Sequence, residues 1–146
     1  MMLMENTSTW IAVIDDEEGI RRALLRLLRS AGLEAHAFIS GKAFLDSLRT
    51  KRPACVLLDL NMQDMSGFAV IKTLEQIDHE LPVLVLTGQD LSDKQKNAEL
   101  AHAMSILQKP VNDQELFAAL AATLVDQKNH VFDPNSNLVT SNQPET

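Results

Sequence analysis

The feature that most constrains the fold of this chain is a short apolar run that ends in a carboxylate. Residues 55–58 read Cys-Val-Leu-Leu, and Asp59 follows them directly. A continuous apolar run of this length is typical of a strand that is buried on both faces, as in a parallel sheet. In open α/β sheets, ligands bind beyond the carboxyl ends of the strands. Asp59 is therefore either a structural cap of the next loop or a working group of a site.

Other short apolar segments alternate with helical patterns along the chain. Together with the first segment they predict strands at 10–14, 33–39, 55–59, 83–86 and 105–108. A helical pattern follows each strand, and the apolar face of the first helix consists of Ile20, Ala23, Leu24, Leu27, Leu28 and Ala31. Asp16 is predicted to cap this helix, and Gly32 to end it. Strands and helices that alternate in this way predict an α/β fold, a (βα)5 doubly wound parallel sheet with right-handed crossovers.

The composition fits one globular domain with an acidic surface. The chain has 146 residues, 45% of them hydrophobic, and a formal net charge of −7. We therefore expect no direct contact with nucleic acid or an anionic membrane, since such binding normally uses a basic patch. Cys55 is the single cysteine, which excludes an internal disulfide and predicts a buried side chain in a reduced, cytoplasmic protein. The sequence has no apolar run of transmembrane length and no signal peptide.

The ends of the chain are polar. We expect a flexible N-terminus at 1–9, one folded domain at 10–127 and a disordered tail at 128–146. The helix predicted within 90–103 has a thin apolar face, so we expect it to be the most mobile helix. No pattern of a second helical domain follows the last helix, and we therefore expect no output domain in this chain.

Every predicted strand except the second ends in a polar side chain that can take part in chemistry. These side chains are Asp15 and Asp16 after the first strand, Asp59 after the third, Thr87 after the fourth and Lys109 after the fifth. Because the carboxyl ends of parallel strands lie at one edge of the sheet, we expect them to converge. Each of them alone has an ordinary explanation as a cap, a strand residue or a solvated lysine. Their shared placement predicts a site.

Carboxylates gathered in one place repel one another. At about 4 Å, a pair of like charges costs roughly 4 kcal/mol at an effective dielectric near 20. A hard divalent cation relieves this repulsion, and Mg²⁺ suits a site with few carboxylates because it keeps several waters. A carboxylate can also attack a phosphoryl group and form an aspartyl phosphate. Lys109 would then neutralise charge, Thr87 and the Gly88 N–H would donate hydrogen bonds, and Asp59 on the central strand is the predicted nucleophile.

These pieces, in this order, resemble the receiver domains of response regulators in two-component signalling, the CheY-like domains. The matching motifs lie at 13–17, 57–62, 65–67, 87–88 and 109–110, and the resemblance covers about residues 9–127. The sequence is most similar to receivers that precede LuxR-type DNA-binding domains. The resemblance implies a flavodoxin-like sheet with strand order 2-1-3-4-5, and a cis peptide bond between Lys109 and Pro110.

The resemblance also implies roles for individual residues. Asp59 would accept a phosphoryl group from a histidine kinase or a phosphotransfer protein. The residues expected to hold Mg²⁺ are Asp15, Asp16, Asp59 and, through its backbone carbonyl, Asn61; those expected to act on the phosphoryl group are Asp59, Thr87, Gly88 and Lys109. Apart from promoting its own phosphorylation and dephosphorylation, such a protein is not an enzyme. It would signal through the surface of helix 4, strand 5 and helix 5, and a homodimer is compatible with the sequence.

The sequence departs from the family pattern at three positions. Gln63 replaces the usual proline after the phosphoacceptor, so we expect a less rigid loop. His102 stands where glycine is usual, at a place that can require a left-handed backbone. Ile106 stands where a switch aromatic residue is usual, so the coupling between Thr87 and the outer surface must follow another route.

Three other functions remain open at this point. A phosphatase of the haloacid-dehalogenase type needs a second aspartate two residues after the nucleophile, and Asn61 occupies that position. A pseudo-receiver that works without phosphorylation is compatible with Ile106, whereas flavin binding is disfavoured because no glycine-rich or hydroxyl-rich phosphate loop follows the first strand. The chain can also be the receiver part of a transcription regulator.

Overall fold

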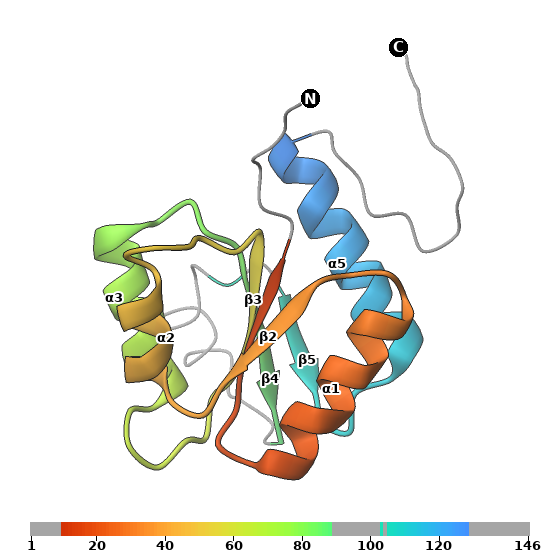
Figure 1. Ribbon diagram of the computed structural model, residues 1–146, viewed down its shortest axis with the longest axis horizontal. Helices are drawn as coiled ribbons and strands as arrows, with labels where there is room; N and C mark the ends of the chain where they lie inside the picture. Colours follow the sequence, from red (N-terminus) through yellow and green to blue (C-terminus); the bar gives the residue numbers. More distant parts are fainter. Residues whose placement is uncertain (1–9, 89–102, 104, 129–146) are drawn as a thin grey trace.

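The computed structural model describes residues 10–88, 103 and 105–128, and it contains a parallel sheet covered by helices on both faces (Figure 1). The strands are β1 (Ile11–Ile14), β2 (Ala35–Phe38), β3 (Cys55–Asp59), β4 (Val83–Thr87) and β5 (Ser105–Gln108). Their order across the sheet is β2-β1-β3-β4-β5, and every neighbouring pair is parallel. The predicted flavodoxin-like α/β fold is therefore confirmed.

Helices follow β1, β2, β3 and β5 and run back along the sheet. The helices are α1 (Glu18–Ser30), α2 (Gly41–Ser47), α3 (Gly67–Ile77) and α5 (Asp113–Lys128). Residues 1–9, 89–102, 104 and 129–146 lie outside the described residues, and all but the last residue of the helix predicted within 90–103 lies there too. Helix α5 reaches Lys128, so it includes the first residue of the predicted tail. No helix in the described part of the chain has the length and apolar character needed to cross a membrane.

The sheet divides the core into two apolar layers. Val56 and Leu58 of β3 belong to the layer that also contains Phe44, Ile71 and Leu74 of α2 and α3. The alternate residues of β3 and the inner faces of α1 and α5 form the other layer, which includes Cys55, Leu57, Leu24, Leu28, Leu116 and Leu120. All residues of β1, β3 and β4 are buried, as the continuous apolar runs predict.

Side-chain caps define where three helices begin. The hydroxyl of Ser40 accepts a hydrogen bond from the N–H of Ala43, and the hydroxyl of Ser66 accepts one from the N–H of Ala69. The Asn112 side chain accepts the N–H groups of residues 114 and 115 at the start of α5. These bonds satisfy N–H groups that have no partner within the helix. Gly32 follows α1 with φ of 88°, which confirms it as the stop.

Some local predictions are wrong. Asp16 does not cap α1: the cap position is Glu17, which makes no side-chain cap bond, and the Asp16 carboxylate instead accepts the N–H of Gln63. Ala23 belongs to the predicted apolar face of α1 but is exposed. The helical spacing from Val70 and Leu74 predicts that Ile77 faces inward as well, but Ile77 is 60% exposed because α3 ends there, beyond the edge of the core.

The turn from β3 into α3 is tightly packed. A Cβ atom added to Gly67 would lie 2.7 Å from the backbone oxygen of Asp59 and 2.7 Å from the Cα of Leu60. The N–H of Gly67 donates to the Leu60 carbonyl, which closes the loop that follows Asp59. This close approach fixes the backbone at the end of the central strand.

Candidate functional site

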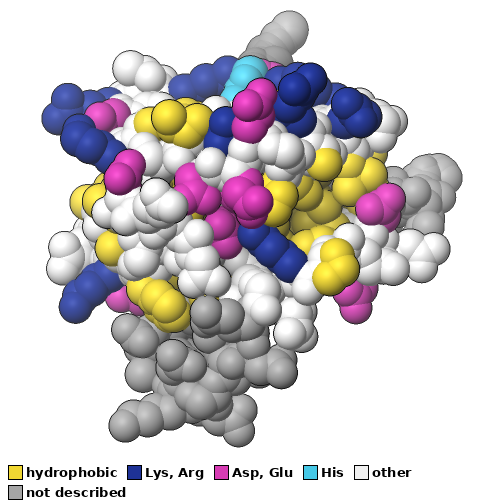
Figure 2. Space-filling model, turned by 90° about the horizontal axis from the view of Figure 1, so that it is seen from below, with side chains coloured by type: hydrophobic (Ala, Val, Ile, Leu, Met, Phe, Trp, Pro, Cys, Tyr) yellow, Lys and Arg dark blue, Asp and Glu magenta, His cyan; other side chains and the backbone are white. Residues whose placement is uncertain are grey.

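The site lies at the carboxyl edge of the sheet, where β1, β3, β4 and β5 end. Figure 2 views this end of the molecule and shows acidic side chains gathered near the centre of the face, with a basic side chain beside them. Asp15 directly follows β1, Asp59 is the last residue of β3, and Thr87 is the last residue of β4. The parallel arrangement brings residues together that are far apart in the sequence, as predicted.

Three carboxylates form the acidic part of the site. One oxygen from each of Asp15, Asp16 and Asp59 lies within 4.8 Å of the others. Asp15 and Asp59 are buried and Asp16 is exposed, so the cluster reaches from the interior to the surface. The Asp15 carboxylate accepts the N–H of Glu17 at 2.9 Å, and the Asp59 carboxylate accepts the N–H of Asn61 at 3.2 Å.

Lys109 joins two of these carboxylates. Its Nζ lies 3.3 Å from Oδ2 of Asp15 and 3.2 Å from Oδ1 of Asp59. The N–H of Lys109 also donates to the carbonyl of Thr87 at 2.8 Å, which holds the end of β5 against the end of β4. The peptide bond to Pro110 is cis, as the resemblance implied.

Burial and neighbouring charges shift two pKa values in the site. Desolvation, followed by repulsion from Asp15, raises the pKa of Asp59; its bonds to the Asn61 N–H and to Lys109 only partly oppose this. Desolvation lowers the pKa of Lys109, but the charges of Asp15 and Asp59 outweigh it and leave that pKa raised. The site thus contains a carboxylate whose charge is costly and a lysine whose charge is stabilised.

The other predicted site residues lie around this centre. Thr87 is buried at the end of β4 beside β5, and Gly88 follows it in an exposed bend. Asn61 contributes its N–H to Asp59, while its side chain is exposed. The structure thus brings Asp15, Asp16, Asp59 and Lys109 into one cluster and places the remaining residues at its border.

Two contacts at this edge were missed by the sequence reasoning. The backbone N–H of Gln63 donates to Asp16 at 3.1 Å, and Arg21 Nη1 donates to the backbone carbonyl of Asp15 at 2.9 Å. A backbone donor from a loop leaves no pattern in a sequence. Arg21 is one of four arginines in α1, and nothing in their spacing distinguishes it from the other three.

The donor set fits a hard divalent cation. It consists of carboxylate oxygens, and the Asp59 charge is held in a desolvated place next to another acid, where a cation would relieve the repulsion. Mg²⁺ prefers oxygen ligands and binds with few carboxylates while it keeps several waters. Asp15, Asp16 and Asp59 are the residues that could hold it.

The fold and this edge site define a class: doubly wound α/β proteins with an acidic, lysine-bridged site at the carboxyl ends of the strands. Residues 11–121 match the family model described as the response regulator receiver domain. The chain therefore belongs to that family and contains the receiver domain of a response regulator.

Individual relatives agree with this assignment. The chain is 30% identical over 121 residues to the response regulator protein TodT of Pseudomonas putida, which covers 83% of this chain and 53% of TodT. It is 36% identical over 124 residues to the DNA-binding transcriptional regulator NtrC of Klebsiella pneumoniae, which covers 85% of this chain and 25% of NtrC. The chain thus spans about half the length of TodT and less of NtrC.

The fold comparison gives the same result. The structure of the Vibrio cholerae chemotaxis protein CheY4 superimposes with a TM-score of 0.73 at 26% identity, and the match covers 81% of this chain and all of CheY4.

Proposed function

We propose that this receiver domain is phosphorylated on Asp59 and passes the signal on through protein contacts. The observation that carries the proposal is the position of Lys109, which bridges Asp15 and Asp59 within an acidic cluster. A structural ion pair needs one carboxylate, whereas this lysine contacts two, with a third carboxylate alongside. An acidic cluster with one bridging cation is suited to bind a divalent cation and a phosphoryl group together.

In the proposed reaction, a carboxylate oxygen of Asp59 attacks the phosphorus of a phosphohistidine. The bond from phosphorus to the histidine nitrogen breaks, and the imidazole leaves on the donor protein. Lys109 is placed to neutralise charge on the phosphoryl oxygens, and the Thr87 hydroxyl and the Gly88 N–H are candidates to donate hydrogen bonds to them. A bound Mg²⁺ would supply further charge neutralisation, held by Asp15, Asp16 and Asp59, with the carbonyl of Asn61 as an additional ligand.

The decisive experiment uses acetyl phosphate and Mg²⁺ with the purified chain. We expect the wild type to gain one phosphoryl group by intact-mass spectrometry, and Asp59→Asn to gain none. Asp64→Asn is the matched control, because Asp64 is an exposed acid in the same loop and outside the cluster. Labelling of Asp59→Asn at the wild-type level would show that Asp59 is not the acceptor, and turnover of a phosphate ester without a stable phosphoprotein would favour a phosphatase.

In this proposal, the protein donor docks in a groove next to Lys109. A groove of about 830 Å³ is lined mainly by apolar side chains of α1 and of the segment after β5, and Lys109 is among its lining residues. Figure 2 shows an apolar hollow beside the acidic centre. Because Lys109 belongs to both the groove and the site, a phosphohistidine protein seated there would present its imidazole close to Asp59.

This docking can be tested separately from the chemistry. Ala23→Asp introduces a charge into the exposed part of the groove. We expect slower phosphotransfer from a purified histidine phosphotransfer protein and unchanged phosphorylation by acetyl phosphate. Ala43→Asp, on the exposed face of α2, is the control. Equal rates from the protein donor with both variants would remove the groove from the proposal.

A second candidate is the receiver part of a transcription regulator. It is favoured by the relatives TodT and NtrC, both longer than this chain, whereas CheY4 is matched over its whole length. The two candidates are distinguished by the size of the protein in its native cells on an immunoblot. We also propose that the protein is cytoplasmic, as predicted from its single cysteine. The Cys55 thiol is buried, and this burial raises its pKa to about 12.

A further inference from the structure

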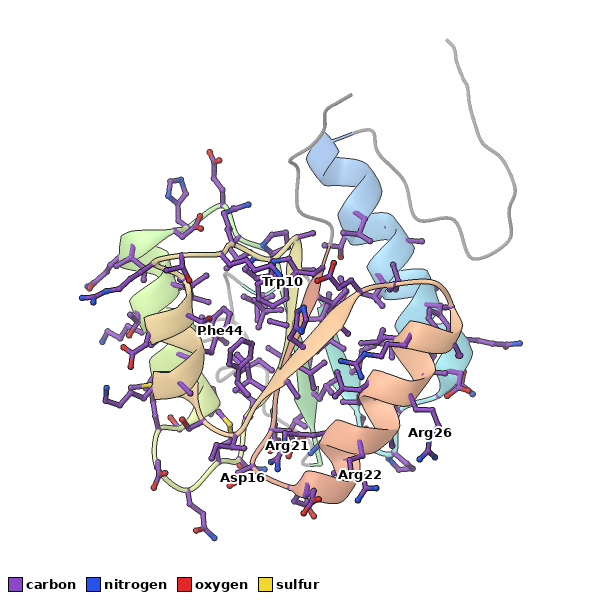
Figure 3. The ribbon with its side chains drawn as sticks, in the orientation of Figure 1. Trp10, Asp16, Arg21, Arg22, Arg26 and Phe44 are labelled. Carbon is purple, nitrogen blue, oxygen red and sulfur yellow. The ribbon has the colours of Figure 1, made fainter. Side chains whose placement is uncertain are left out.

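Arg21 is an α1 side chain that turns back toward the acidic cluster. Its Nη1 donates a hydrogen bond to the backbone oxygen of Asp15 at 2.9 Å. That oxygen belongs to the peptide group that joins Asp15 to Asp16. Figure 3 shows Arg21 close to Asp16 at the edge of the sheet, whereas Arg22 and Arg26 lie on the outer side of α1. Arg21 therefore holds the peptide that links two of the clustered acids.

The other hydrogen bonds of the Asp15–Asp16 turn are made by different atoms. The N–H of Asp15 donates to the carbonyl of Phe38 at 3.2 Å, which fixes the end of β1. The Asp15 carboxylate accepts the N–H of Glu17, and the Asp16 carboxylate accepts the N–H of Gln63. Each carboxylate thus has its own donor, and the plane of the peptide between them is held by Arg21.

We propose that Arg21 is a positioning residue for divalent-cation binding. By holding the peptide group between Asp15 and Asp16, it keeps their two carboxylates in the relative orientation that a small cation needs. The inference rests on the proposed function, because it takes the acidic cluster as the Mg²⁺ site. It assigns to Arg21 a role beyond that of a solvated charge on a helix face.

An electrostatic role and a positioning role of Arg21 predict opposite changes in Mg²⁺ affinity when Arg21 is removed. Arg21 is a cation near the cluster, so its electrostatic effect alone opposes the binding of another cation, and its removal would tighten Mg²⁺ binding. If Arg21 acts by positioning, its removal loosens the Asp15–Asp16 turn and weakens binding. Loss of a group that orients metal ligands typically reduces metal affinity about 10–100-fold.

A comparison of Mg²⁺ and Ca²⁺ affinities distinguishes a positioning role of Arg21 from a general loosening of the fold. Mg²⁺ requires near-ideal octahedral geometry, whereas Ca²⁺ accepts flexible coordination. Loss of a positioning residue therefore weakens Mg²⁺ binding more than Ca²⁺ binding. A general decrease in stability would weaken the binding of both cations alike.

The neighbouring arginines provide matched controls. Arg22 pairs with Glu18 at 3.5 Å on the exposed face of α1. Arg26 has no hydrogen bond or ion pair with the part of the chain that the structure describes. Arg26→Met therefore removes one positive charge from the same helix without touching the peptide between the acids.

The test is calorimetric titration of the purified, unphosphorylated chain with Mg²⁺ and, separately, with Ca²⁺. We expect Arg21→Met to weaken Mg²⁺ binding about tenfold and Ca²⁺ binding less. Arg26→Met should bind both cations as the wild type does, or slightly more tightly. Arg21→Lys keeps the charge and loses the planar fork, so any weakening of Mg²⁺ binding in this variant comes from geometry.

The outcomes are distinguishable. Unchanged or tighter Mg²⁺ binding by Arg21→Met, in a chain whose wild type binds Mg²⁺, overturns this inference alone. An equal loss of Mg²⁺ and Ca²⁺ affinity also overturns it. If the wild type binds no Mg²⁺, the proposed metal site fails, and the role of Arg21 fails with it.

Discussion

Strands β3 and β5 bring the two opposite charges of the site, Asp59 and Lys109, to the same edge of the sheet, but they are embedded differently. All residues of β3 are buried, and this strand pairs with both β1 and β4. Residues of β5 are half-buried or exposed, and among the described strands β5 pairs with β4 alone. Asp59, the proposed nucleophile, thus stands at the end of a fully buried strand, while Lys109 is held by local bonds and by the carboxylates that it contacts.

The lower burial of β5 also applies to Ile106, which stands where receiver domains usually have a switch aromatic residue. Ile106 of β5 is half-buried and packs against the apolar layer that contains α2 and α3. It pairs in register with Val85 of the buried strand β4. The predicted contact surface of helix 4, strand 5 and helix 5 includes residues outside the described part of the chain, so that surface stays a prediction.

The largest expected effect compares the two strands directly. Leu58→Ala should lower the free energy of unfolding by about 2–5 kcal/mol, because it removes a fully buried side chain and leaves a cavity. Ile106→Ala should cost about 1–2 kcal/mol, because part of its side chain is already exposed. Urea denaturation measures both. Equal losses would mean that β5 is held as firmly as β3.

The next prediction concerns the lysine. Lys109→Gln removes the charge that contacts both Asp15 and Asp59, and we expect the rate of phosphorylation by acetyl phosphate to fall about a hundredfold. The control is Lys72→Gln on the exposed face of α3. A wild-type rate in Lys109→Gln would leave that lysine with a structural role only.

The rigid support of Asp59 can be tested at Gly67. Gly67→Ala places a Cβ against the backbone of Asp59 and Leu60, and we expect it to destabilise the protein by about 1–3 kcal/mol. Gly19→Ala is the matched control, because a Cβ there meets nothing within 4 Å and an alanine in a helix gains about 0.5–1 kcal/mol. Thermal unfolding of the two variants should therefore shift in opposite directions.

The smallest expected effect is the contribution of the Asp59 charge to the pH dependence of protein stability. Because the pKa of Asp59 is raised above 3.8, this group favours the folded state when it is protonated, and that contribution is lost as the pH rises through its raised pKa. In metal-free buffer, Asp59→Asn should therefore melt at a higher temperature than the wild type, with a difference that grows as the pH rises from about 4. A difference that shrinks over this range would mean that Lys109 stabilises the ionised form more than burial and Asp15 destabilise it.

Much of the fold could be predicted because three strands, β1, β3 and β4, are buried on both faces. The continuous apolar runs that end at Ile14, Asp59 and Thr87 mark the strands themselves and the edge of the sheet where ligands bind. The amphipathic pattern of α1 was clear enough to identify Leu24 and Leu28 as core residues. Helical spacing was too coarse for Ala23 of α1 and Ile77 of α3, because exposure at the margin of the core depends on which elements lie next to a helix.

The residues of the candidate site could be named in advance because each of Asp15, Asp59, Thr87 and Lys109 stands at the end of a strand, and chain topology places all such ends together. Which group each of them contacts was decided by the tertiary structure. The bridge from Lys109 to both acids, the Gln63 N–H on Asp16 and the Arg21 side chain on the Asp15 carbonyl join segments from different loops and helices. The sequence by itself determined the edge of the sheet at which the polar groups gather, because its apolar runs show which strands are buried and where each of them ends. Only the packed structure decided their orientation, because hydrogen-bond geometry depends on distances between segments that the sequence does not fix.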